Sequence, residues 1–501
     1  MSRLLAAWGT LTTPADLFLV IWQHVNSPAV RRTHLAGAYN TAETVYDAFE
    51  TALKQDDGAD AVAKVVKVLG DYWSDQASEK GRKTRAGLLL GAMRAIDDAF
   101  LTIHPRTLLA RSTLAPPPGW AIAARDKRTI AGLYAATNER GLVPRGPFAR
   151  NTRGPLETSN FSLADQFVAC AVVPLAIEED GRRIEVAVTV VGQGVARGVP
   201  PRLGRSGSEA ITLAPLAEAT GDLVARVRED DGTFYIDVEQ GAGFAPHDIF
   251  AGMLSDLGDT DVLLLPELVV APADVEAMRD SLATSSGDRP RLIVCGSGGE
   301  ANGSEPPWNM SYIVNGAGAP LWSHRKLVAY DMLETTFANL EIKDIGKAKQ
   351  LMEQISWSNA ITIGDVEGLG RCLVLICQDL MMAGIEPLIR AYEPDYLFLP
   401  ILDSGTNFFR WPYKRLVDLS AAGPTRFVAV SSLTMQHWRK KSYPGEQIGV
   451  AVGPRNIAAG DAGADGERMA QEIVCESATR RHGSIRWRSG AWETVPEPKP
   501  K

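Results

Sequence analysis

The sequence contains little cysteine, and none of it lies in a pattern that would bind a metal. Its 501 residues include five cysteines, with no Cys-x-x-Cys pair and no Cys/His spacing typical of a metal site. They are Cys170, Cys295, Cys372, Cys377 and Cys475. An odd number of scattered thiols argues against a disulfide framework and favours reduced cysteines in a cytoplasmic protein. The sequence therefore implies no metal and no other cofactor.

Long apolar runs and a strong charge excess are also missing. No uninterrupted apolar stretch approaches the roughly 20 residues that cross a bilayer, and Thr, Pro and Asp interrupt the apolar stretch near the start, which makes it a poor signal peptide. The net charge of −8 gives no overall field that would recruit nucleic acid or an acidic membrane. With 45% hydrophobic and 22% charged residues, the composition is typical of a globular protein long enough for two or more domains.

The chain divides by pattern into four segments. Residues 1–112 carry apolar positions at helical spacing and few Gly or Pro, which predicts a helical domain and a candidate surface for a protein partner. Consecutive prolines in Ala115–Trp120 mark a boundary, and residues 113–160 are expected to form a Pro/Arg-rich linker. Strand patterns fill most of 161–490, and 491–501 are expected to be a disordered tail.

Three apolar runs each lead to a residue that amide hydrolysis would use. Glu267 ends DVLLLPE, Lys326 ends LWSHRK, and Cys377 follows RCLVLI. Short apolar runs bounded by polar residues predict buried strands, and open α/β folds place their chemistry just past the carboxyl ends of such strands. A base, a cation and a thiol at three strand ends predict a nucleophilic site.

These segments resemble the nitrilase superfamily of carbon–nitrogen hydrolases. The strand Arg291–Ser297, the stretch Trp308–Leu327 and the later strands Asp395–Pro400 and Arg426–Ser432 are similar to core strands of that family, in the same order, within residues 230–455. The resemblance implies an α/β fold, a nitrilase-type four-layer α-β-β-α sandwich, here preceded by an all-α N-terminal domain. It also implies a homodimer or a larger homo-oligomer.

The resemblance gives each of the three residues a role. Glu267 is implied as the base that takes the proton of Cys377, and Lys326 as the cation beside the developing oxyanion. The backbone N–H of Gln378 is implied as the second oxyanion donor. A thiol with an ordinary pKa of about 8.5 needs a nearby base or cation to attack at neutral pH, and we expect Lys326 to lower the pKa of Cys377.

Three further polar residues lie close to these positions in the sequence. Family members usually carry a second glutamate before the cysteine; Glu353 matches it as an accessory residue, with Glu334 as a competing candidate. His324 lies two residues before Lys326 and is expected at the surface, at the end of a strand.

The expected function is amidase-type hydrolysis of a nonpeptide C–N bond in a small amide-like molecule, through a thioester acyl-enzyme. The alternative is a regulatory or interaction protein, such as a ligand sensor or a component of a stress or defence system, built on the same sandwich. Nucleic acid and membrane partners are not expected. Residues after the cysteine, such as Gln378, depart from the usual family pattern, so the acyl group and the leaving amine stay open.

Two structural points have alternatives. The first core strand is either Thr233–Glu239 or Phe167–Leu175 followed by a long insertion, and the Gly/Pro/Arg-rich stretch 192–208 favours the second. The expected homodimer would form through apolar helix faces, for which Ala273–Ala283 and Ile385–Tyr392 are the candidates.

Overall fold

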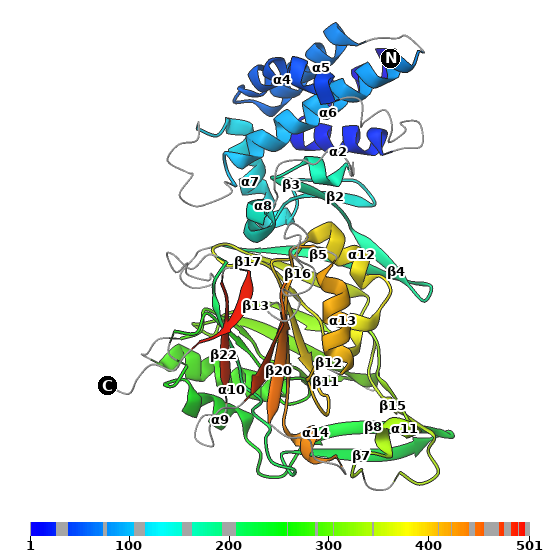
Figure 1. The fold of residues 1–501 in the computed structure, drawn as a ribbon, viewed down its shortest axis with the longest axis vertical. Helices are drawn as coiled ribbons and strands as arrows, with labels where there is room; N and C mark the ends of the chain where they lie inside the picture. Colours follow the sequence, from blue (N-terminus) through cyan, green and yellow to red (C-terminus); the bar gives the residue numbers. More distant parts are fainter. Residues whose placement is uncertain are drawn as a thin grey trace. The chain divides into compact units, whose positions relative to one another are not determined.

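The structure, a computed structural model, describes residues 2–495 except 27–38, 74–77, 105–115, 153–162, 193–206, 258, 286–288, 304, 343–344, 409, 422, 440–445, 455–469, 475–481 and 489. Cys475 and residues 496–501 of the expected tail therefore lie outside the described residues. Contacts divide the chain into two units, Met1–Ala176 and Ile177–Lys501 (Figure 1). In the part of the chain that the structure describes, no helix has the length and apolarity needed to span a bilayer.

The first unit is built on helices whose apolar faces share one core. Its helices are α1 (Ser2–Trp8), α2 (Pro14–Val25), α4 (Tyr39–Leu53), α5 (Gly58–Tyr72), α6 (Glu79–Leu101), α7 (Gly119–Ala131), α8 (Pro147–Thr152) and the 3₁₀ helix η2 (Ala164–Gln166). Buried side chains from α2, α4, α5 and α6 pack into a single cluster that includes Phe18, Phe49, Leu69 and Phe100. The described residues of the segment 1–112 are thus mainly helical.

The segment 113–160, expected to be a linker, contributes to this same unit. It contains α7 and α8, and a three-stranded antiparallel sheet is formed by β1 (Ala135–Ala136), β2 (Arg140–Pro144) and β3 (Cys170–Pro174). Trp120 is buried, and its Nε1 donates to a backbone carbonyl oxygen of α4 at 3.0 Å. Arg145 also points inward and donates to a backbone carbonyl oxygen at 3.1 Å. The arginines of this segment thus serve partly to satisfy buried carbonyls, and the division between the units falls at Ala176 rather than near residue 113.

Within its described residues, the second unit contains two eight-stranded sheets and a four-stranded one. The first sheet has the order β11-β12-β10-β9-β6-β22-β23, with β13 paired to β12. Its strands are β6 (Ala210–Leu213), β9 (Val262–Leu264), β10 (Leu292–Val294), β11 (Gly298–Asn302), β12 (Glu305–Asn315), β13 (Pro320–Arg325), β22 (Gly483–Arg488) and β23 (Ala491–Thr494). Its centre is parallel, because β9 runs parallel to both β6 and β10.

The second large sheet has the order β21-β20-β19-β18-β17-β16-β5-β4. Its strands are β4 (Ala176–Glu179), β5 (Arg182–Val191), β16 (Ala360–Val366), β17 (Gly370–Val374), β18 (Tyr396–Ile401), β19 (Arg426–Ser431), β20 (Gln447–Val452) and β21 (Ala470–Val474). Strand β18 is parallel to β17 and β19. A separate four-stranded sheet has the order β14-β15-β8-β7 and comprises β7 (Leu223–Asp230), β8 (Thr233–Gln240), β14 (Asp331–Leu333) and β15 (Gln350–Glu353).

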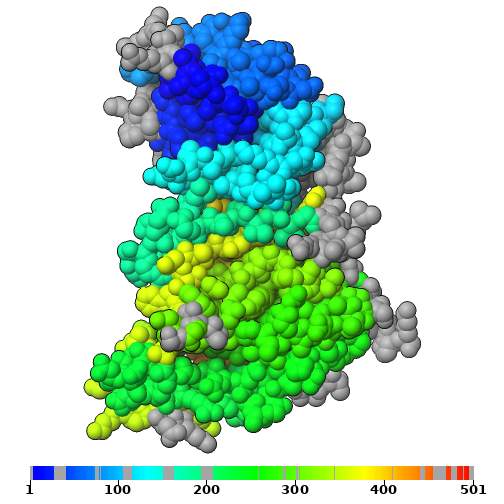
Figure 2. All heavy atoms as spheres, turned by 180° about the vertical axis from the view of Figure 1, so that it is seen from behind, coloured from blue at the N-terminus to red at the C-terminus, as the bar shows by residue number. Residues whose placement is uncertain are grey.

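Helices cover the outer faces of the two large sheets. On the first sheet, α9 (Pro246–Met253) and α10 (Pro272–Thr284) share a core with side chains such as Leu263 and Ile293. In the space-filling view from behind, green atoms of the stretch that carries these helices form much of the visible surface of the unit (Figure 2). On the second sheet lie α12 (Ile385–Tyr392) and α13 (Trp411–Ser420), with α13 against β19 and β20 (Figure 1). The shorter helices are α11 (Glu334–Phe337), η3 (Cys377–Met381) and α14 (Thr434–His437).

The inner faces of the two sheets meet closely at glycines. A Cβ atom at Gly364 of β16 would lie 2.5 Å from the ring of Trp322 on β13, and one at Gly449 of β20 would lie 2.3 Å from Leu213 on β6. Real Cβ atoms do not approach other atoms so closely, so these two glycines allow the sheets to pack face to face. The order of layers is helix, sheet, sheet, helix, which is the α-β-β-α sandwich expected from the resemblance.

Neither candidate for the first core strand is correct. The strand Thr233–Glu239 forms β8 of the small sheet, and Phe167–Leu175 contains β3 of the first unit. The strand that precedes β9 in the chain and pairs with it in parallel is β6, Ala210–Leu213. A tight hairpin joins β4 to β5, because the two strands pair and both Asp180 and Gly181 have positive φ, as a type I′ turn requires.

The helix faces expected to form a dimer are part of the internal core. On α10, Met278 and Leu282 are 1% and 0% exposed, and on α12 the side chains of Leu388 and Ile389 are fully buried. Their apolar spacing therefore reflects packing against the sheets, and these side chains are not available to a second copy of the chain.

Candidate active site

Strand ends of several sheets place the candidate residues at one edge of the sandwich. Glu267 follows β9, Lys326 directly follows β13, Cys377 follows β17, and Glu353 is the last residue of β15. The carboxyl ends of strands are where open α/β sheets gather reacting groups, because the chain leaves the sheet there and side chains are free of the core.

The structure brings Glu267, Lys326 and Cys377 together with Glu353. Lys326 Nζ donates to Glu267 Oε1 at 2.7 Å and to Glu353 Oε2 at 2.6 Å. The Cys377 side chain is hydrogen-bonded to Glu267. Glu267, Lys326 and Cys377 are 1%, 2% and 5% exposed, so a cation, two carboxylates and a thiol form one nearly buried cluster.

The turns that carry the thiol and the carboxylate both contain left-handed backbone. Cys377 has φ 49°, and Leu268, next to Glu267, has φ 59°. A residue with a Cβ atom pays about 1–2 kcal/mol for this conformation, and such strain is concentrated at functional sites. At Cys377 the left-handed residue turns the chain sharply from β17 into η3, with the thiol at the turn.

Asp379 ties the cysteine turn to the strand that precedes the lysine. Its carboxylate accepts the N–H of Ile376 at 3.1 Å, just before the thiol, and the N–H of Leu327 at 2.8 Å, just after the lysine. His324 Nε2 lies 2.9 Å from Asp379 Oδ2. His324 is 2% exposed, so its expected place at the surface is wrong: it lies inside, on the face of β13 that meets the cysteine turn.

The cluster shifts the pKa values of its members through burial and mutual charge. Burial raises the pKa of Glu267; the positive charge of Lys326 opposes this shift, and the negative charge of Glu353 adds to it. Burial alone would lower the pKa of Lys326, but the carboxylates of Glu267 and Glu353 outweigh it and hold that pKa well above its usual value.

Cys377 differs from expectation in the direction of its pKa. Burial and the charge of Glu267 raise the pKa of the thiol well above its usual value, although Lys326 opposes the shift. The resting group is therefore a neutral thiol that donates a hydrogen bond to Glu267, rather than a thiolate stabilised by the lysine.

Sequence reasoning missed two contacts of the cluster. Asn309 of β12 is buried and its Nδ2 donates to Glu267 Oε1 at 3.0 Å and to Glu353 Oε1 at 3.1 Å. The backbone N–H of Leu402, after β18, donates to Glu267 Oε2 at 2.9 Å. A polar residue at an inward position of an otherwise apolar strand was the available signal for Asn309; a backbone donor leaves no signal in the sequence.

The remaining candidates are placed as follows. Glu334 is exposed at the start of α11 and does not join the cluster, whereas Glu353 does. Gln378 is half-buried in the first turn of η3, where a helix offers its N–H groups no internal acceptor. Cys170, Cys295 and Cys372 are buried and unpaired. Within the described residues, no group of three or more His, Cys, Asp or Glu side chains is placed to hold a metal ion.

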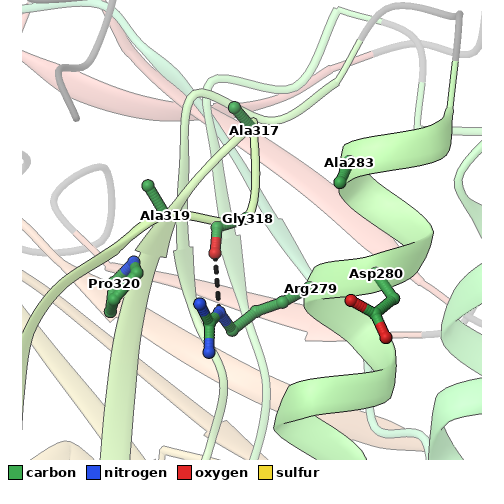
Figure 3. Close-up of a pocket in the computed structure, with 7 residues that line it drawn as sticks. All are labelled: Arg279, Asp280, Ala283, Ala317, Gly318, Ala319 and Pro320. Carbon is green, nitrogen blue, oxygen red and sulfur yellow. Dashed lines mark hydrogen bonds between the residues drawn. The ribbon is translucent and has the colours of Figure 1, made fainter. Parts of the chain in front are cut away.

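A surface hollow between α10 and the turn from β12 to β13 is separate from this cluster. It is lined by Arg279, Asp280, Ala283, Ala317, Gly318, Ala319 and Pro320 (Figure 3). Arg279 Nε donates to the Gly318 carbonyl oxygen at 2.7 Å across it. The hollow shares no residue with the cluster, and the arginine that faces it is already used to hold the turn against the helix.

Among curated proteins, the similarity of this chain is limited to a short stretch. No family model matches the sequence. The curated DNA repair protein RecO of Variovorax paradoxus is 34% identical over 100 residues, which are 19% of this chain and 39% of that protein. The chain thus spans about two-fifths of the length of this curated relative.

Several solved structures are similar to about half of the chain at low identity. Saccharomyces cerevisiae Nit3, of branch 10 of the nitrilase superfamily, is 13% identical, with a TM-score of 0.35 over 50% of this chain and 84% of that chain. The C. elegans NitFhit protein is 14% identical, with a TM-score of 0.35 over 50% and 56%. A double mutant of the amidase from Nesterenkonia sp. AN1 is 13% identical, with a TM-score of 0.34 over 50% and 86%.

Proposed function

We propose that this protein is an amidase-type hydrolase of nonpeptide C–N bonds, with Cys377 as nucleophile, Glu267 as base and Lys326 as the oxyanion cation. The observation that carries the proposal is the buried cluster itself. A thiol hydrogen-bonded to a carboxylate, with an ammonium group 2.7 Å from the same carboxylate, supplies the three groups that acyl transfer through a thioester needs.

In the acylation step, Cys377 Sγ attacks the amide carbonyl carbon while its proton passes to Glu267. The negative charge that develops on the carbonyl oxygen would be stabilised by Lys326 and by the backbone N–H of Gln378. The C–N bond then breaks, and the departing ammonia or amine takes the proton from Glu267. The acyl group remains on sulfur as a thioester.

In the deacylation step, Glu267 takes a proton from a water molecule whose oxygen attacks the thioester carbon. The C–S bond breaks, the acid product leaves, and the proton on Glu267 returns to the sulfur of Cys377. Glu353, 2.6 Å from the lysine, would act as the accessory carboxylate that holds Lys326 in place through both steps.

The pKa directions fit proton transfer at the moment of attack. A neutral resting thiol is a weak nucleophile, so the base must remove its proton as the C–S bond forms. Glu267 suits this role because its raised pKa makes it a stronger base than an exposed glutamate. With Cys377 only 5% exposed, the arrangement favours small acyl groups or terminal amides over large substrates.

Turnover of a panel of small amides, followed by ammonia release, tests the proposal. Cys377→Ala, Lys326→Ala and Glu267→Gln should each lower turnover by about two orders of magnitude or more, with non-additive effects in combination. Cys295→Ala is the matched control, since that thiol is also buried and lies in another layer of the same unit. Full turnover in Cys377→Ala, or loss of turnover in chelator that zinc restores, would contradict the proposal.

A further inference from the structure

Asn309 contacts both carboxylates that Lys326 bridges. Its Nδ2 has two N–H bonds, and the structure directs them to Glu267 Oε1 at 3.0 Å and Glu353 Oε1 at 3.1 Å. Lys326 Nζ binds the same two side chains at 2.7 and 2.6 Å. The two glutamates are therefore held from two directions, by a cation and by a neutral amide.

The orientation of the Asn309 amide follows from this contact. If the amide were reversed, its carbonyl oxygen would face two carboxylate oxygens, and all three are acceptors. In the observed orientation Oδ1 is buried and, within the described part of the chain, has no hydrogen-bond partner. An unsatisfied buried carbonyl is unfavourable, so fold stability alone does not account for an amide at this position of the strand.

The backbone fixes Asn309 at the level of the cluster. Its carbonyl oxygen accepts the N–H of Lys326 at 2.8 Å, which sets the end of β13 beside it. The side chain of Asn309 and the ammonium of Lys326 thus approach the carboxylates from adjacent strands, β12 and the end of β13.

We propose that Asn309 is a positioning residue that holds Glu267 and Glu353 at the spacing Lys326 bridges and keeps Glu267 ionised and aimed at the thiol. This inference rests on the proposed function, since it concerns the base of that reaction. Two like charges in a buried site repel, and a neutral donor shared between them favours their charged forms without adding a third charge.

The groups that face Glu267 define what a titration would measure. From the described elements packed around it, these are Lys326, Glu353 and Cys377. The other titratable or charged groups at the site are Tyr330, whose N–H donates to Glu353 Oε2 at 3.0 Å, the ion pair of Asp403 with Arg410, and the pair of Asp379 with His324. Of these groups, Glu267 is the one hydrogen-bonded to the thiol. We therefore expect protonation of Glu267 to cause the fall in the alkylation rate of Cys377 at low pH, which we call the acid limb.

Alkylation of Cys377 by iodoacetamide reports the protonation of Glu267 and needs no known substrate. The alkylation rate is measured by peptide mapping at a series of pH values. In the wild type the rate should fall at acid pH as Glu267 takes up a proton. Asn309→Ala should move the midpoint of that limb upward by about one pH unit. Asn309→Asp keeps the shape of the side chain but removes its donors and adds a carboxylate, so its midpoint should move further upward.

Asn315→Ala is the matched control, because Asn315 is equally buried on the same strand but uses its side chain to accept N–H groups of the turn after β12. This control should leave the midpoint unchanged. Thermal unfolding of each variant shows which are folded, and the Asp and Ala variants give two independent chances to observe the shift.

The outcomes separate the two proposals. If Glu267→Gln removes the acid limb while both Asn309 variants keep the wild-type midpoint, the role of Asn309 is overturned and the base assignment stands. If Glu267→Gln leaves the wild-type limb in place, or if wild-type Cys377 does not react, the proposed function fails and this inference fails with it.

Discussion

At the scale of single residues, all four described cysteines are buried, and they differ mainly in their hydrogen-bond partners. Burial raises the pKa of Cys295 to about 12 and those of Cys170, Cys372 and Cys377 well above the usual value. Only Cys377, among these described thiols, is hydrogen-bonded to a carboxylate that can take its proton. Reactivity should therefore follow the base rather than the intrinsic acidity of the thiol.

We expect iodoacetamide at near-neutral pH to modify Cys377 faster than Cys170, Cys295 or Cys372 in the folded protein. Cys377 is hydrogen-bonded to Glu267, which can take its proton. It is also 5% exposed, whereas Cys170, Cys295 and Cys372 are 0%, 1% and 0% exposed. Mass-spectrometric peptide mapping of a time course measures the order. Preferential labelling of Cys372, with Cys377 left intact, would remove Cys377 as the nucleophile.

Lys326 should also matter for stability, because its removal leaves two carboxylates buried without a cation. Lys326→Met keeps most of the side-chain volume and should lower the free energy of unfolding by about 3–5 kcal/mol at neutral pH. The loss should be smaller at acid pH, where a proton can neutralise one of the carboxylates. Chemical denaturation at two pH values measures it, and an unchanged unfolding midpoint at neutral pH would argue against the buried cluster.

At the scale of elements, the contact between the two large sheets depends on residues without a side chain. Gly364→Ala should lower the free energy of unfolding by about 1–3 kcal/mol, because the new methyl group meets the Trp322 ring in a packed core. Gly299→Ala is the matched control, since Gly299 is also in a strand but has nothing within 4 Å of its Cβ position. Equal effects of the two substitutions in urea denaturation would contradict the face-to-face packing.

The sequence predicts the elements that carry Glu267, Lys326 and Cys377 because each follows a short apolar run, and the run is itself the buried strand. It does not predict β6, since a strand of only four residues, Ala210–Leu213, is too short to show a period. The contacts of Asp379 with His324 and of Asn309 with Glu267 join elements far apart in the chain. Such pairs follow from the tertiary arrangement and leave no local pattern.

At the scale of the whole molecule, the first unit should have its own pH dependence, set by Asp97 of α6. Its carboxylate accepts the N–H groups of Val168, Ala169 and Cys170, which lead into β3. Burial outweighs these donors and raises the pKa of Asp97 from 3.8 to about 6. Because the folded-state pKa is above the unfolded one, this group's contribution to stability is fully present below about pH 4 and is lost as pH rises through about 6.

Asp97 should change the free energy of unfolding by about 3 kcal/mol across this pH range, because its pKa is shifted by roughly two units. The unfolding transition of the first unit should therefore move to higher temperature as pH is lowered from 7 to 4, after allowance for other groups. Asp97→Asn should reduce this slope, since the amide does not titrate. A variant whose pH dependence matches that of the wild type would show that Asp97 is not the responsible group.

The division at Ala176 separates the two functional hypotheses. Glu267, Lys326, Cys377, Glu353 and Asn309 all lie in the second unit, so a fragment 177–501 should keep turnover if the protein is an enzyme whose first unit is an addition. A partner-regulated protein should lose complex formation or control instead. Comparing ammonia release by the fragment and by the full chain measures this, and a fragment that unfolds would show that the two units depend on each other.

The left-handed backbone at Cys377 affects which residues evolution would favour at this position. Glycine adopts that conformation without strain, so Cys377→Gly would relieve the backbone strain at this turn while removing the thiol. Relief of backbone strain and retention of the thiol therefore favour different residues at position 377. A chain that keeps cysteine there retains a backbone strain of about 1 kcal/mol, so the residue found at this turn indicates whether the thiol is still required.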